Sequence, residues 1–142
     1  MIFCTKTSCQ FVFVQKKIAI CYDTVAAHVL TDEKWFCFVL EQVLSNALKY
    51  TNHGSVTIAM ETPELLTIRD TGIGIAPEDV PRVFEKGYTG YNGRADHKST
   101  GLGLYLCKRT MDRLHHGISL TSTVGEGTTV TLDLRREERV IE

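Results

Sequence analysis

The chain has 142 residues, 43% of them hydrophobic, which is enough for one domain with a sizeable core. Sixteen Lys and Arg against seventeen Asp and Glu leave a formal net charge of −1, so bulk charge gives no support for a nucleic-acid or membrane-surface partner. No apolar run reaches the length of a membrane span, and five cysteines without a CxxC pair indicate neither a disulfide framework nor a zinc ribbon. We therefore expect a cytoplasmic chain in a reducing compartment.

The first half of the chain alternates between strand and helix signals. Alternating or β-branched runs at 11–14, 17–21 and 26–30 predict two or three strands. An N-cap at Thr31 or Asp32 and apolar residues at helical spacing then predict a helix that ends at Tyr50.

The rest of the chain predicts two hairpins, two helices and a loop. Alternation predicts the strands, prolines and glycines place their turns, and a polar, glycine-containing stretch without periodicity predicts the loop. In chain order we expect a hairpin of 56–60 and 65–70, a short helix 77–84, a mobile loop 86–99, a helix 101–115, and a hairpin of 118–123 and 128–134. The predicted class is α+β, with one mainly antiparallel sheet covered by helices on one face.

Polar side chains share one stripe of the first helix, because their positions are i, i+4, i+7 and i+8. An Asn oxygen is a suitable ligand for Mg²⁺, and a Lys one turn further on would neutralise phosphate charge. The alternative is that the stripe is only the solvated face of an amphipathic helix. The stripe consists of Gln42, Asn46, Lys49 and Tyr50.

A carboxylate ends the apolar row of the strand before the first glycine turn. Leu66, Ile68 and Asp70 share a face by the period of two, so the carboxylate is expected to be buried and to need a donor. An adenine amine would supply that donor, and Gly72 and Gly74 would let the backbone pass close to the base. The alternative is a self-capping Asp turn without a ligand.

A second glycine turn opens a helix and carries no acid. Gly101 and Gly103 would leave N–H groups free at a helix N-terminus, which is a ready anion site. Neither a Rossmann fingerprint nor a P-loop is present, because the first turn has no third glycine and no G-x-x-x-x-G-K-[ST] occurs.

The order of these elements resembles the GHKL ATPases, and among them the catalytic ATP-binding domain of bacterial sensor histidine kinases. Residues 84–90 and 101–108 look most like kinases of the bacitracin-resistance, intramembrane-sensing type. Five segments carry the resemblance: 41–50 looks like the N box, 70–75 like G1, 83–87 like the F box, 99–104 like G2 and 125–128 like G3.

The resemblance implies a two-layer α/β sandwich of the Bergerat type, ATP and Mg²⁺ as cofactors, and an ATP lid at 78–99. It implies Asp70 on the adenine amine, Tyr50 against the base and Asn46 on Mg²⁺. Pattern and resemblance together assign a catalytic role to Asn46 and Lys49, metal binding to Asn46, and nucleotide binding to Asn46, Lys49, Tyr50, Asp70, Gly72, Gly74, Ile75, Lys86, Thr100, Gly101, Leu102, Gly103, Leu104 and Thr128.

Two features distinguish this chain from its relatives. Gln42 stands where related hydrolases carry a Glu that activates water, and an amide cannot act as a general base, which favours transfer to a presented nucleophile. Neighbouring Glu41 is a weaker candidate base because it points about 100° away on the helix. None of the five histidines lies in an H box, so the phosphoacceptor is expected in a separate dimerisation domain.

The expected organisation is a lead-in or artificial remnant at 1–16, the catalytic domain at 17–135 and a charged tail at 136–142. The expected partners are ATP, the dimerisation domain of the same kinase and a response regulator, with the full-length protein anchored in the membrane. Two alternatives are a standalone anti-sigma-type serine kinase of the same superfamily and an ATP-dependent regulatory module without phosphotransfer.

Overall fold

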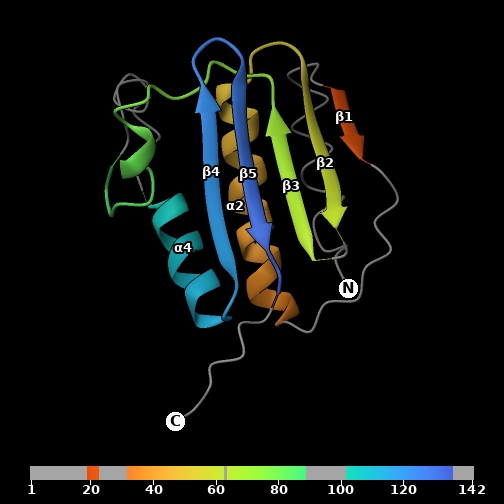
Figure 1. The fold of residues 1–142 in the computed structure, drawn as a ribbon, viewed down its shortest axis with the longest axis vertical. Helices are drawn as coiled ribbons and strands as arrows, with labels where there is room; N and C mark the ends of the chain where they lie inside the picture. The colour runs from red at the N-terminus through yellow and green to blue at the C-terminus, as the bar shows by residue number, and fades with distance from the viewer. Residues whose placement is uncertain (1–18, 23–31, 63, 89–101, 136–142) are drawn as a thin grey trace.

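The computed structural model describes residues 19–22, 32–62, 64–88 and 102–135. In these ranges the chain forms one five-stranded sheet in the order β1-β2-β3-β5-β4, with two α-helices packed on one face (Figure 1). The strands are β1 Ala19–Tyr22, β2 Ser55–Thr62, β3 Leu65–Asp70, β4 Gly117–Thr123 and β5 Gly127–Asp133; the helices are α2 Glu33–Tyr50 and α4 Gly103–Arg113, with a 3-10 turn η1 at Val80–Arg82.

The sheet confirms the predicted α+β class. Strand β1 pairs with β2 in parallel, and the β2–β3, β3–β5 and β4–β5 pairs are antiparallel. Both predicted hairpins are present, as is the strand predicted at 17–21, which is described from residue 19. The strands predicted at 11–14 and 26–30 lie outside the described residues.

Helix α2 begins and ends close to where the sequence predicts. The Asp32 side chain accepts a hydrogen bond from the Trp35 N–H at 3.3 Å, which caps the first turn. Trp35 in this first turn is 51% exposed, and its ring packs edge-on against Phe38. Most of the other apolar residues of α2 are buried in the core.

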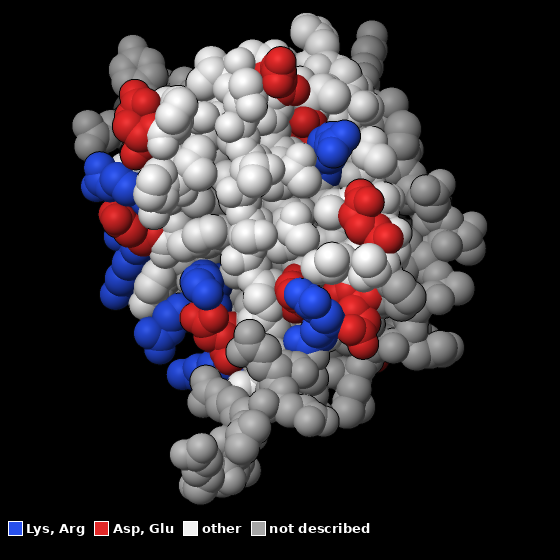
Figure 2. Space-filling view, in the orientation of Figure 1, with Lys and Arg blue, Asp and Glu red and all other residues white. Residues whose placement is uncertain are grey.

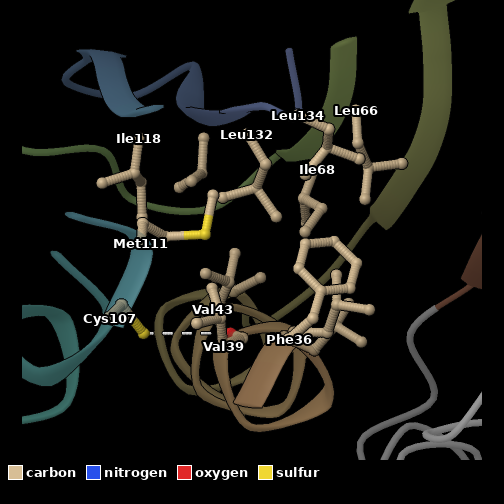
Figure 3. Close-up of a cluster of buried hydrophobic side chains, with 14 of the residues drawn as sticks. Phe36, Val39, Val43, Leu66, Ile68, Cys107, Met111, Ile118, Leu132 and Leu134 are labelled. Atoms are coloured by element: carbon tan, nitrogen blue, oxygen red, sulfur yellow. Dashed lines mark hydrogen bonds between the residues drawn. The ribbon is translucent and has the colours of Figure 1, made fainter. Parts of the chain in front are cut away.

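The core lies between the two helices and the sheet. Met111 of α4 and Val39 and Val43 of α2 are buried against side chains of β3 and β5 (Figure 3). The Cys107 Sγ lies 3.8 Å from the Val39 carbonyl oxygen, and burial raises the pKa of this free thiol to about 12.

The helix predicted at 77–84 is only the 3-10 turn η1 within a series of turns. Most hydrogen bonds of this segment join residues three apart, as from Arg82 N–H to the Asp79 carbonyl at 2.9 Å and from Glu85 N–H to the Arg82 carbonyl at 3.0 Å. Pro81 lacks an N–H and cannot make the bond that would continue an α-helix.

No helix of the described ranges covers the other face of the sheet, which is polar but largely uncharged. Figure 2 shows a continuous white area over the middle of this face, with charged side chains mostly around it. The strand residues that alternate with the core residues include Thr57, Thr67, Thr121, Thr129 and Thr131. No helix in the described part of the chain is long and apolar enough to cross a membrane.

Candidate functional site

Four side chains on neighbouring strands form a row across the helix-covered face of the sheet, at the end where β3 ends. Val56 pairs with Asp70, Asp70 with Thr128, and Thr128 with Ser122. Residues paired across neighbouring strands point to the same face, so the row borders the core beside buried Val56. Figure 1 shows this end of the sheet at the top, where β3 ends and β4 turns into β5.

Asp70 is a buried acceptor in this row, as the alternation predicts. Its Oδ1 accepts hydrogen bonds from the Gly72 N–H at 2.9 Å and the Thr128 N–H at 3.2 Å, and the residue is 7% exposed. Burial raises the pKa of its carboxyl, and the two backbone hydrogen bonds oppose that rise. Within the described part of the chain no donor bonds its Oδ2, so a ligand donor would find an acceptor there.

The turn after Asp70 is fixed by two backbone hydrogen bonds of Ile73. The Ile73 N–H donates to the Tyr50 carbonyl at 3.0 Å, and the Ile73 carbonyl accepts from the Gly125 N–H at 2.9 Å. A Cβ on Gly72 would overlap the Tyr50 carbonyl oxygen, and one on Gly74, whose φ is +77°, would overlap the Thr123 carbonyl oxygen. These two glycines therefore let the turn fit between the end of α2 and the β4–β5 turn.

The α2 stripe differs from the solvated face of the same helix. Glu41 and Ser45 are exposed, whereas the four predicted stripe residues are half-buried. The Lys49 ammonium lies 5.5 Å from the centroid of the Tyr50 ring. The half-buried residues are Gln42, Asn46, Lys49 and Tyr50.

Helix α4 starts against this stripe. A Cβ added to Gly103 would lie 2.9 Å from the Gln42 Oε1, so the first residue of α4 sits one turn of α2 away from Asn46. The N-cap residue is Leu102, which has no side-chain acceptor, and first-turn N–H groups have no partner within a helix. The start of α4 and the amide stripe of α2 therefore lie together.

Other predicted residues lie near this centre or outside the described ranges. Leu104 is half-buried in the first turn of α4, and Lys86 is exposed, with its ammonium 6.0 Å from the Tyr105 ring of that turn. Thr100 and Gly101 lie outside the described residues, as does the predicted lid beyond residue 88.

The sequence analysis did not single out two residues that lie at this site. Ser122 bonds the Ile75 N–H at 2.8 Å; it follows Ile118 and Leu120 on one face of β4, the same signal that placed Asp70. Thr51 is fully buried at the end of α2, and its Oγ1 has no hydrogen-bond partner among the described residues. No sequence pattern singled it out.

Comparison with known proteins agrees with this geometry. Residues 31–138 match the family described as histidine kinase-, DNA gyrase B-, and HSP90-like ATPases. This match spans more than half of the chain and includes α2, both glycine turns and both hairpins. The chain therefore belongs to this ATPase family.

Named relatives narrow the class. The chain is 40% identical over 131 residues to the sensor protein BceS of Halalkalibacterium halodurans. This match covers 90% of this chain and 39% of that protein. It is 42% identical over 118 residues to the sensor protein kinase GraS of Staphylococcus aureus strain MRSA252, covering 81% of this chain and 34% of that protein. The chain thus spans well under half the length of these relatives.

Solved structures share the fold. The mycobacterial sensor histidine kinase MprB matches with a TM-score of 0.73 at 22% identity, over 88% of each chain. Full-length ShkA in complex with AMPPNP matches with a TM-score of 0.73 at 23% identity, over 87% of this chain and 26% of that one. Sequence and fold together place the chain with the ATP-binding catalytic domains of sensor histidine kinases.

Proposed function

We propose that this domain binds Mg²⁺·ATP and transfers the γ-phosphoryl group to a histidine on a separate dimerisation domain, for relay to a response regulator. The observation that carries the proposal is the buried Asp70 carboxylate, held by two backbone N–H groups and with its Oδ2 available to a donor. A buried carboxylate at this position would accept from an exocyclic amine and would repel a phosphate. This end of the row therefore suits the adenine.

The triphosphate fits the other end of the site. The start of α4 offers backbone N–H groups and the positive end of the helix dipole, next to the stripe that carries Asn46 and Lys49. The described residues contain no cluster of three His, Cys, Asp or Glu side chains that could hold a metal ion. The Asn46 side-chain oxygen would hold Mg²⁺ together with phosphate oxygens, because this ion usually takes few protein ligands.

In this arrangement the residues position the nucleotide and neutralise its charge. Bound Mg²⁺ would supply charge neutralisation across the phosphates. Lys49 would add positive charge from the same helix face, and Asp70 would fix the base at the far end. Gln42, which meets the first residue of α4, cannot take a proton from water, so this position does not favour hydrolysis.

The wider role follows from the relatives and is part of the same proposal. Because BceS and GraS are named sensor proteins and this chain spans 39% and 34% of them, we infer a membrane-anchored full-length kinase with this domain on the cytoplasmic side. The intramembrane-sensing type stays a prediction.

Phosphotransfer tests the function against its two alternatives. The chain is mixed with γ-labelled ATP, Mg²⁺ and a separately made dimerisation domain of the same kinase, with a dimerisation domain lacking the acceptor histidine as control. We expect acid-labile, alkali-stable label on the intact acceptor only. Acid-stable label on serine would favour the serine kinase, and nucleotide binding without transfer would favour the regulatory module.

A further inference from the structure

The Ser122 hydroxyl contacts three polar groups around the candidate adenine site. Its Oγ lies 2.8 Å from the Ile75 N, 3.0 Å from the Gly127 carbonyl oxygen and 2.8 Å from the Thr128 Oγ1. These partners belong to the turn after β3 and to the start of β5. Ser122 therefore fixes the turn that follows Asp70 and the residue that donates to Asp70.

The chemistry of the three partners fixes where each proton lies. A serine hydroxyl has one proton to donate and two lone pairs to accept with. The Gly127 carbonyl can only accept, so Ser122 donates its proton there, and the Ile75 N–H can only donate. The remaining partner, the Thr128 hydroxyl, must then donate to Ser122.

This assignment makes the row poor in side-chain donors. With its proton committed to Ser122, the Thr128 Oγ1 has only lone pairs left for a ligand. Asp70, its register partner, has no proton to donate when it is ionised, and its Oδ1 already accepts the Thr128 N–H. Both side chains therefore present acceptors, which suit an amine and oppose a carbonyl oxygen.

We propose that Ser122 is a specificity-determining residue: by holding the Thr128 proton away from the ligand, it makes the base site select a purine with an exocyclic amine over one with a carbonyl oxygen in its place. The inference rests on the proposed nucleotide site. Ser122 acts through Thr128, so it is a positioning residue and is not expected to touch the base.

The test compares ADP with IDP, in which a carbonyl oxygen replaces the amine. Calorimetric affinities are measured for the wild-type chain and for Ser122→Ala, with Ser119→Ala as the matched control on the exposed face of the same strand. We expect the wild-type chain and Ser119→Ala to prefer ADP by on the order of ten- to a hundredfold. We expect Ser122→Ala to lower that preference by roughly two- to tenfold, since the freed Thr128 hydroxyl can then donate to the carbonyl oxygen.

A double-mutant cycle separates this role from a structural one. In a Thr128→Val background, adding Ser122→Ala should leave the ADP-to-IDP ratio unchanged, and Ser122→Thr alone should keep the wild-type ratio. If Ser122→Ala weakens ADP and IDP equally, the inference is wrong although the nucleotide site stands. If the wild-type chain binds neither nucleotide, the proposed function itself fails. Should Ser122→Ala not fold, the ADP-to-IDP ratio is measured for Thr128→Val and Thr128→Ser instead. The inference predicts a lower ratio for Thr128→Val only, and an equal ratio in both variants would overturn it.

Discussion

Asp70 combines two opposing demands. Its burial raises the pKa of the carboxyl, so ionisation of this residue costs folding free energy. The same ionised group is the strongest acceptor that the row can offer to an amine. We infer that the domain retains the destabilising charge because nucleotide binding requires it.

Replacing Asp70 by Asn should therefore stabilise the nucleotide-free domain at neutral pH. The amide oxygen can still accept from the Gly72 and Thr128 N–H groups but carries no charge. Because the folded pKa lies above the ordinary value of 3.8, the native state retains a proton that the unfolded state has lost, and stability falls as the pH rises from about 3.8 through the raised pKa.

Urea denaturation across that pH range measures the effect. The difference in free energy of unfolding between Asp70→Asn and the wild type should grow with pH and then level off. A difference that does not change with pH would contradict the assigned cost of the Asp70 charge.

Asn46 is predicted to couple metal and triphosphate. Asn46→Ala should weaken ATP binding in Mg²⁺ by roughly tenfold or more and leave binding in EDTA nearly unchanged, because few protein groups share the ion. Ser45→Ala, one residue away on the exposed face, should retain the wild-type response. An unaltered Mg²⁺ response in folded Asn46→Ala would mean that the stripe is a partly covered polar face without a metal role.

For single residues, the sequence predicts the face on which a side chain lies better than it predicts the contacts of that side chain. The alternation that ends at Asp70 and the spacing of the α2 stripe both depend on local periodicity, and both faces agree with the structure. The roles of Ser122 and Thr128 depend on the pairing of β3 with β5 across the sheet, which no local pattern specifies.

The two glycine-containing turns at the site have different constraints. Gly74 and Gly125 both have positive φ, at +77° and +82°. A Cβ on Gly74 would overlap the Thr123 backbone, whereas nothing lies within 4 Å of a Cβ on Gly125. The first turn is thus limited by packing as well as by backbone conformation.

Gly74→Ala should cost more stability than Gly125→Ala and should weaken ADP binding. Gly125→Ala carries the left-handed conformational penalty of roughly 1–2 kcal/mol alone. Gly74→Ala must also move the β4–β5 turn, on which the Ile73–Gly125 hydrogen bond depends. Thermal melts and ADP titrations check this order, and equal effects of the two substitutions would show that the close packing at Gly74 is not limiting.

Helix α4 is fixed to the core by Met111, which is fully buried. Met111→Ala should lower the free energy of unfolding by about 2–5 kcal/mol, while Leu106→Ala on the same helix, 41% exposed, should change it by about 0.5 kcal/mol or less. Chemical denaturation of both variants provides the comparison. A similar loss for both would place the main contact of α4 elsewhere.

The sequence predicts most elements but not their order in the sheet. Capping by Asp32 and the apolar spacing define α2, and alternation defines both hairpins. Placing β5 between β3 and β4 is a long-range choice, which local propensity does not determine. The helix predicted at 77–84 is shortened to η1 because Pro81 cannot supply the required N–H.

At the scale of the molecule, elements distant in sequence meet at one end of the sheet. The end of β3, the end of α2 and the β4–β5 turn lie together there, and the start of α4 adjoins α2 (Figure 1). The two described α-helices pack on one face, and the row of Asp70, Thr128 and Ser122 lies on that face. The proposed base site and the proposed phosphate site therefore both lie on the helix-covered side of the sheet, at this end.

The most direct test is calorimetric titration of the wild-type chain and Asp70→Asn with ADP and with ATP, both in Mg²⁺. A lost hydrogen bond to a charged group costs roughly 1.5–3 kcal/mol, which corresponds to about ten- to over a hundredfold in affinity. We predict that Asp70→Asn loses this much for both nucleotides alike, since the contact is to the base and not to the γ-phosphate. Unchanged ADP affinity in folded Asp70→Asn, or a loss confined to ATP, would contradict the assignment of Asp70 to the adenine.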